Sequence, residues 1–109
     1  MTLNNFKDLL LTIGPPVLHY FASGQTGNYI VWAEDGEGSS VHADGQKIER
    51  TITGTLDYFT KAEDDPVKQQ IEDTLDTDDG LAWSLNSVQY EQDTGYIHFE
   101  WAWEVDGSG

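Results

Sequence analysis

The sequence predicts an α+β fold: a mainly antiparallel sheet of about five strands with two helices packed on one face. Two segments, beginning near Thr2 and Asp65, repeat apolar side chains at the three- and four-residue spacing of an amphipathic helix. Five further segments are typical of strands, and the last, residues 96–105, alternates large apolar side chains with polar or small ones. Each helical segment has one apolar stripe, so both helices are expected on one face of the sheet. The expected order is α-β-β-β-α-β-β.

The first helix is expected to begin after Thr2, whose side chain can cap it, and to end at the Gly-Pro-Pro sequence of residues 14–16. Its apolar positions follow one side of a helix. They are Leu3, Phe6, Leu9, Leu10 and Ile13.

Two strands, residues 17–21 and 29–33, are expected next, joined by a turn of glycine and small polar residues over 23–28. Residues 33–47 contain three glycines and little apolar content, so they predict a long loop or an extended, mobile hairpin tip. Long loops in compact domains often carry function. The candidate interface residues of this loop are Glu34, Asp35, Glu37, His42 and Asp44.

A third strand, residues 48–59, is predicted to be long and central, with Gly54 as a candidate β-bulge. The second helix is expected to be capped by Asp64 or Asp65, to have a proline at its first position and to end near Gly80. Its apolar residues repeat every four positions: Val67, Ile71 and Leu75.

The last two strands, residues 81–91 and 96–105, are predicted to form a hairpin around residues 92–95. One face of the last strand is expected in the core: Ile97, Phe99, Trp101, Trp103 and Val105. The other face suits water or a partner, and its candidate site residues are His98, Glu100 and Glu104. Residues 106–109 are expected to form a flexible tail, and residues 1–109 a single domain.

Composition excludes some functions and favours none strongly. Twenty Asp and Glu residues stand against five Lys and Arg, a net charge of −15, so the chain is not expected to bind nucleic acid by neutralising its phosphates. Such an excess of acids is typical of very soluble proteins, of proteins adapted to high salt, and of proteins with a surface that resembles or repels a polyanion. The chain has no cysteine, which removes disulfides and thiolate sites. No signal peptide or membrane span is expected, and a soluble protein is predicted.

No motif of known chemistry is present, and no catalytic, cofactor-binding or metal-binding residue is predicted. The three histidines, His19, His42 and His98, lack the close spacing of ligands on one element. His98 and Glu100 share a strand face, as an acid and base pair would, but a solvated strand face is the favoured interpretation. The acidic segment 73–80 fails as an EF-hand because Leu75 stands where the loop requires a carboxylate. An enzyme is the least supported class.

The order of elements resembles the small tail-terminator and tail-completion proteins of long-tailed phages and prophages. The residues that carry the resemblance cover nearly the whole chain. They are NNFKDLLLTIG, NYIVWAE, the ADG of residues 43–45, RTITGTLDYFTKAED, DPVKQQIEDTL and VQYEQDTGYIHFEWAWEV. The acidic second helix and the glycine-rich loop depart from the pattern.

The resemblance implies a structural virion protein without cofactor. Such proteins form a ring, commonly a hexamer, that ends the tail tube and joins it to the head. The implied partners are the tail tube protein, the head-tail connector protein and other copies of the chain, and the implied location is the head-tail interface of the virion, after assembly in the host cytoplasm. DNA would pass without tight binding, because carboxylates facing a channel offer phosphates no favourable contact.

Two alternatives stay open at the level of sequence. The chain could be an acidic decoy that imitates DNA and inhibits a DNA-binding protein. Residues 63–79 carry eight acids and one lysine, which suits this interpretation as well as the first. The acidity could also reflect a high-salt habitat.

Overall fold

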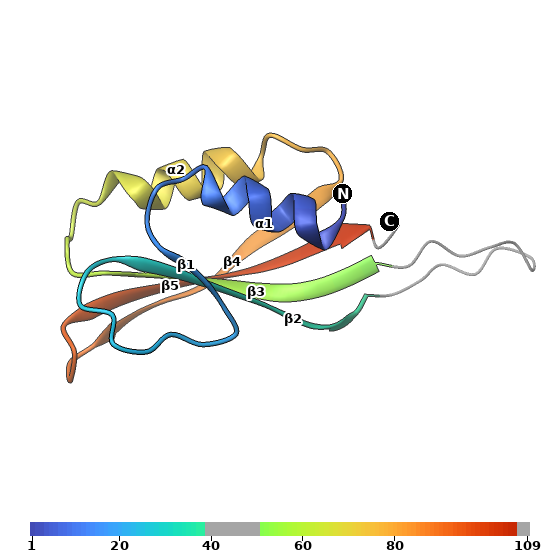
Figure 1. The fold of residues 1–109 in the computed structure, drawn as a ribbon. Helices are drawn as coiled ribbons and strands as arrows, with labels where there is room; N and C mark the ends of the chain where they lie inside the picture. Colours follow the sequence, from blue (N-terminus) through green and yellow to red (C-terminus); the bar gives the residue numbers. More distant parts are fainter. Residues whose placement is uncertain (39–50, 107–109) are drawn as a thin grey trace, which may run out of the picture.

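Both helices of the protein lie on one face of a five-stranded sheet (Figure 1). The structure is a computed structural model that describes residues 1–38 and 51–106. The strand order is β1-β2-β3-β5-β4, and every neighbouring pair is antiparallel except β1 and β2. The elements are α1 (Leu3–Leu11), β1 (Val17–His19), β2 (Tyr29–Glu37), β3 (Thr51–Thr60), α2 (Pro66–Leu75), β4 (Leu81–Glu91) and β5 (Tyr96–Asp106). The predicted fold class and element order are confirmed.

The first helix, α1, packs on the sheet through its buried residues Phe6 and Leu10. The Thr2 side chain accepts a hydrogen bond from the Asn5 N–H at 3.0 Å, so Thr2 is the N-cap that the sequence predicts. The ring of Phe6 lies 4.4 Å from that of Trp103 between centroids. This aromatic contact joins the helix to the centre of the core.

The edge strand β1 has three residues rather than the predicted five, because the chain turns at Tyr20, whose φ is 73°. The Phe21 N–H donates to the His19 carbonyl at 3.0 Å and closes a three-residue turn. Residues 20–28 then pass over the sheet face opposite the helices (Figure 1). There the Tyr96 hydroxyl donates to the Gly27 carbonyl at 2.9 Å. One end of that face is therefore covered.

The strand β2 extends to Glu37, four residues beyond the predicted strand. These four residues pair with β3, and the register shifts between Glu34 and Gly36, so Asp35 is the extra residue of a β-bulge. Of the two predicted alternatives, a loop is wrong for residues 34–37, and an extended hairpin agrees with their pairing to β3. Their polar side chains suit the solvent-exposed end of a hairpin as well as they suit a loop.

Gly54 of β3 is not the bulge residue that the sequence suggested. It pairs with Glu34 in a regular part of β3, and the bulge lies across from it on β2. A Cβ atom at Gly54 would collide with the Ala33 carbonyl oxygen and with Cζ2 of Trp103. Glycine is needed here because the Trp103 indole lies directly on the backbone of β3.

The second helix, α2, buries Ile71 and Leu75 against the sheet. The Asp65 carboxylate caps it by accepting from the Val67 N–H at 2.8 Å. The helix ends at Leu75, so the predicted end near Gly80 is wrong. Residues 76–79 supply no apolar side chain to continue the buried stripe, and the chain turns into β4 there.

The final hairpin, β4 and β5, has the predicted strands, with β5 one residue longer. Trp101, Trp103 and Val105 are buried on the helix-covered face, as the alternation predicts. Ile97 and Phe99 share that face but are half-buried. Asp106, expected in a tail, is the last residue of β5 and pairs with Thr51. Residues 107–109 lie outside the described part of the chain.

Candidate functional site

The sheet face opposite the helices, which we call the open face, carries the predicted partner-facing residues. His98, Glu100 and Glu104 all lie on it, brought together by the two-residue period of β5. Tyr96 belongs to the same face but is buried, with only 6% of its surface exposed, because residues 20–28 cover it. The open face is therefore a polar surface bounded at one end by an aromatic contact.

His98 is held on the open face by two carboxylates from neighbouring strands. Its Nε2 lies 2.7 Å from Oδ1 of Asp57 on β3, and its Nδ1 lies 3.6 Å from Oε2 of Glu91 on β4. The imidazole also stacks on Phe59, with the ring centroids 4.2 Å apart. The acid that the sequence paired with His98 was Glu100, whereas its hydrogen-bonding partner is Asp57.

The hydrogen bond to Asp57 raises the pKa of His98 above its ordinary value. The partial burial of the imidazole opposes this rise, while the negative charges of Asp57, Glu91 and Glu100 add to it. The side chains of His98 and Asp57 are only 20% and 17% exposed, so solvent screens this pair less than a surface pair. The open face therefore favours a positive charge at His98.

Asp57 and Glu100 stand directly opposite each other in the register of β3 and β5. Like charges at directly opposed positions of a sheet are destabilising. His98 relieves part of this repulsion through its contact with Asp57, which leaves an excess of negative charge at the centre of the open face.

A second group of side chains gathers at the turn after β1. His19 Nε2 lies 2.6 Å from Oε1 of Glu34. Burial raises the pKa of Glu34, but hydrogen bonds from its own backbone, His19 and Tyr20 outweigh this and hold the pKa below its ordinary value. Phe21 beside them is 75% exposed and lines a shallow hollow of about 400 Å³ that also includes Asp57 and Glu100.

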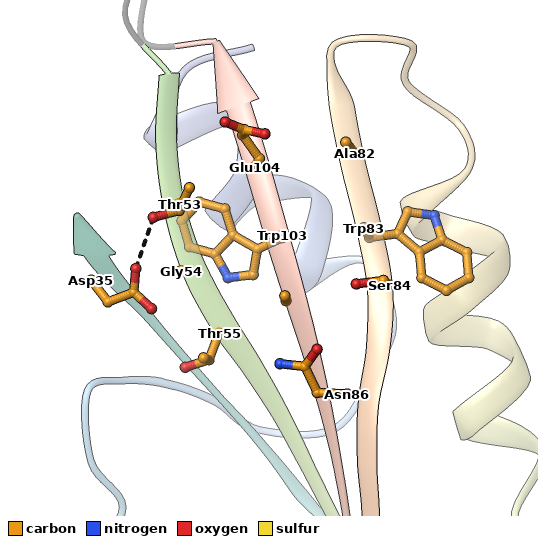
Figure 2. Close-up of a pocket in the computed structure, with 11 residues that line it drawn as sticks. Asp35, Thr53, Gly54, Thr55, Ala82, Trp83, Ser84, Asn86, Trp103 and Glu104 are labelled. Atoms are coloured by element: carbon orange, nitrogen blue, oxygen red, sulfur yellow. Dashed lines mark hydrogen bonds between the residues drawn. The ribbon is translucent and has the colours of Figure 1, made fainter. Parts of the chain in front are cut away.

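Another shallow hollow, of about 390 Å³, lies over β3, β5 and β4 (Figure 2). Asp35 from the β-bulge stands at its rim and accepts a hydrogen bond from the Thr53 hydroxyl at 2.8 Å. Glu104 stands at the top of the hollow in this view, and Ser84 and Asn86 of β4 line the side away from Asp35. The lining combines polar and acidic side chains with apolar ones, among them Ala82, Ala102 and the indole of Trp103.

The candidate interface residues of the predicted loop fall into two groups, one on β2 and one outside the described residues. Glu34, Asp35 and Glu37 lie on β2, in or beside the bulge, and not in a loop. His42 and Asp44 lie outside the described residues. The acidic side chains that the sequence selected here are therefore held on a strand, at the end of the β2–β3 hairpin.

The arrangement offers charge and hydrogen-bonding groups, without a recognisable catalytic constellation. Within residues 1–38 and 51–106, no group of three or more His, Cys, Asp or Glu side chains is placed to hold a metal ion. His98 and Asp57 form a hydrogen-bonded pair, but the serine and threonine hydroxyls of Figure 2 line a separate hollow. This surface therefore offers charged and hydrogen-bonding groups to whatever contacts it.

Two features of the surface were missed by sequence reasoning. Asp57 and Glu91 join His98 only through the strand register, which no local pattern reveals. The other feature is the row Leu85, Val88 and Tyr90 on β4, whose side chains are 40%, 53% and 65% exposed. The alternation in β4 was visible in the sequence, but its place at an edge of the sheet was not.

Comparison with known proteins leaves the family open. No protein-family model matches the chain, and no curated protein matches it significantly. Among the described helices, none is long and apolar enough to span a membrane.

Proposed function

We propose that the protein is a structural subunit of a phage or prophage tail, of the tail-terminator and tail-completion kind. In this role, copies of the chain form a ring, commonly of six, that ends the tail tube and contacts the head-tail connector. The proposal includes no catalytic activity and no cofactor.

The observation that supports the proposal best is the order and arrangement of the elements. Every described segment that carries the resemblance folds as the element expected of it: one helix, a hairpin, a second helix and a closing hairpin. Both helices are on one side of the sheet, which leaves the open face and the two sheet edges for contacts between subunits. This arrangement suits an assembly subunit, whose function lies in its surfaces.

The negative charge of the open face suggests how the ring would let DNA pass. Asp57, Glu91, Glu100 and Glu104 are set in the sheet, and His98 contacts two of them, Asp57 and Glu91. A surface of this sign repels phosphates, so a channel lined by it would let DNA move without being held. Basic side chains at the same positions would retain it.

The direct test uses a tail tube protein from the genome that encodes this chain. Tube protein polymerises alone or with the purified chain, and negative-stain electron microscopy measures tube lengths and the appearance of tube ends. We expect shorter tubes that carry a ring at one end. Tubes of unchanged length without a ring would refute the proposal.

The decoy alternative predicts a different result in the same preparation. A DNA mimic would bind a basic DNA-binding protein of the host, and DNA or salt would displace it. A decoy binds the DNA-binding protein and leaves tube length unchanged. A ring subunit shortens the tubes and does not bind the DNA-binding protein.

A variant then tests the role of the charge separately from assembly. Glu100→Lys with Glu104→Lys should still cap tubes but should reduce DNA delivery from complemented particles, because the lysines offer phosphates favourable contacts. Glu100→Gln with Glu104→Gln is the matched control and should deliver DNA better than the lysine variant. Equal delivery by all three would show that the open face does not line the channel.

A further inference from the structure

The outer edge of β4 is the most exposed apolar feature of the final hairpin. Among the described strands β4 pairs only with β5, so its other edge has free backbone groups over eleven residues. Leu85, Val88 and Tyr90 are 40%, 53% and 65% exposed. Residues 81–90 contain no Asp, Glu, Lys or Arg. Proteins usually protect such an edge with charges or proline, and β4 has neither before Glu91, which leaves its bulge at Asn86 as a partial protection.

The side-chain classes of β4 read the same in both directions. From Trp83 to Asn86 they are aromatic, polar, aliphatic, polar, and from Tyr90 back to Ser87 they are again aromatic, polar, aliphatic, polar. The bulge places the symmetric apolar residues on one face of the sheet. It shifts the alternation by one residue, so that Trp83 and Leu85 before it share a face with Val88 and Tyr90 after it.

From this symmetry we propose that β4 pairs with β4 of a second copy of the chain, antiparallel, about a two-fold axis between Asn86 and Ser87. The pairing sets Leu85 opposite Val88 and Trp83 opposite Tyr90, which makes one apolar row across both chains on the helix-covered face. The two five-stranded sheets join into one, with all four helices on the same side.

The charges beside the strand support this register. The axis sets Glu91 opposite Ala82, and Glu91 is the only charged residue of β4, so within the paired strands no acid faces an acid. The contact is thus free of direct repulsion between two chains of net charge −15. Their overall repulsion still opposes association, and salt screens it. The dimer should therefore strengthen as salt is added.

The other sheet edge fits this strand less well. β1 has three residues, so it offers at most a short ladder to an eleven-residue partner. A contact between β4 and the β1 edge would also leave a free edge on each copy and produce species larger than a dimer. The β4 contact closes on two copies, goes beyond the proposed function and does not depend on it.

The test is sedimentation analysis of the purified chain over a range of concentrations, at about 0.05 M and about 0.5 M NaCl. We expect a reversible monomer–dimer equilibrium that is tighter at the higher salt. Leu85→Lys and Val88→Glu should each weaken the dimer by about tenfold or more, and an equal mixture of the two should restore it, because the new charges face each other. Leu11→Lys is the matched control, since Leu11 is 54% exposed on α1 and should leave the dimer unchanged.

A second measurement keeps the test decisive if a charged variant fails to fold. The chain has no cysteine, so a mixture of Leu85→Cys and Val88→Cys chains should oxidise mainly to the mixed disulfide dimer. A monomer at every concentration and salt, species larger than a dimer, a dimer insensitive to Leu85→Lys, or preferential like-with-like crosslinking would each overturn the proposal.

Discussion

At the scale of single residues, Trp101 and Trp103 are neighbours on the core face of β5 with different surroundings for their indole N–H groups. Trp101 Nε1 donates to Oε2 of Glu72 at 3.0 Å, whereas Trp103 Nε1 is buried with no hydrogen-bond partner among the described residues. Trp101→Phe removes a charge-assisted hydrogen bond, while Trp103→Phe removes an N–H group that makes no hydrogen bond with the described residues.

We therefore expect Trp101→Phe to lower the free energy of unfolding by about 1 kcal/mol more than Trp103→Phe does. Denaturant unfolding followed by far-UV circular dichroism measures both losses without depending on tryptophan emission. Both substitutions remove similar volume, so each controls for the cavity of the other. Equal losses would mean that the Glu72 contact contributes nothing to stability.

His98 should make the stability of the protein depend on pH. Its folded-state pKa is raised above the ordinary value by Asp57, so its contribution is fully present below the unfolded pKa of about 6.5 and is lost as pH rises through the folded pKa. His98→Gln should therefore be more destabilising at about pH 5.5 than at about pH 8.5, on either side of the unfolded value. Thermal melts of both proteins at the two pH values measure this difference.

Asp57→Asn supplies the control for that experiment. It removes the largest cause of the raised pKa, so His98→Gln in an Asp57→Asn background should lose most of its pH dependence. A pH dependence that persists in the double variant would assign the effect to Glu91 and Glu100 instead.

Sequence could select His98 but not its partners. The alternation of β5 places His98 on the face opposite the tryptophans, and this is confirmed. Its contact with Asp57 depends on which strands are neighbours and in what register, and these are set by packing of the whole sheet. Local periodicity carries no information about that choice.

At the scale of elements, the start of α2 is tied to β3 by one carboxylate. Asp65 caps the helix and also accepts a hydrogen bond from the Tyr58 hydroxyl at 2.5 Å, which itself accepts from Asn28 Nδ2 at 2.9 Å. Burial and the bond to Asp65 raise the pKa of Tyr58 to about 12. The hydroxyl is therefore neutral and a donor over the ordinary pH range.

Tyr58→Phe should cost about 1.5 to 3 kcal/mol of unfolding free energy, because it removes a buried hydrogen bond to a charged group. Thr2→Ala, which removes only the cap of α1, should cost about 1 kcal/mol and serves for comparison. Chemical denaturation of the two variants measures these losses. A smaller loss of unfolding free energy than that of Thr2→Ala would show that water hydrogen-bonds the Asp65 carboxylate as well as the Tyr58 hydroxyl does.

The elements that sequence predicted well are those whose buried face is regular. Phe6 and Leu10 in α1 and Trp101 and Trp103 in β5 mark both the element type and the side that is buried. Prediction failed where the side chains are polar on every side. The end of β2 has no apolar residue after Ala33, so its pairing with β3 left no signal.

Gly54 illustrates a different kind of failure. A glycine inside a strand pattern indicates either a bulge or the close approach of another group. The sequence cannot distinguish these, because the group that approaches, Trp103, is distant along the chain. Here the close approach applies, and the bulge forms at Asp35 on the neighbouring strand.

At the scale of the whole molecule, the net charge of −15 should make stability depend on salt. Self-repulsion among twenty acids opposes the compact state, and salt screens it. We expect the melting temperature to rise between about 0.01 M and about 1 M NaCl. Scanning calorimetry measures it, and KCl should give the same rise if screening is the cause. A chain unfolded at the lower salt would favour adaptation to a saline habitat.

The β2–β3 hairpin allows assembly to be separated from folding. The Gly38 N–H donates to the Thr51 carbonyl at 3.1 Å, so the two strand ends are close enough for a short turn to join them. Replacing residues 39–50 by such a turn should leave the melting transition nearly unchanged, because every core contact described above lies outside that segment. The same variant should fail to cap tail tubes if the segment contacts a neighbouring subunit or the tube.

Tube capping by the shortened chain at the normal level would remove that segment from the proposed interface. A lost melting transition would instead assign the segment to the fold, and the assembly result would then be set aside. The candidate interface residues Glu34, Asp35 and Glu37 are kept in this variant because residues 34–37 pair with β3.

The contrast between Trp83 and the other three tryptophans gives the protein two kinds of intrinsic fluorophore. Trp32, Trp101 and Trp103 are buried, whereas Trp83 is half-buried and donates from Nε1 to the exposed Asp76 carboxylate at 2.8 Å. An indole near water emits at longer wavelength than one in a dry core, so the red side of the emission band belongs to Trp83. Quenching by iodide or acrylamide should act first on that component, and Trp83→Phe should remove it. The fluorescence of Trp83 can therefore show, without an attached dye, whether β4 is in contact with solvent or with another surface.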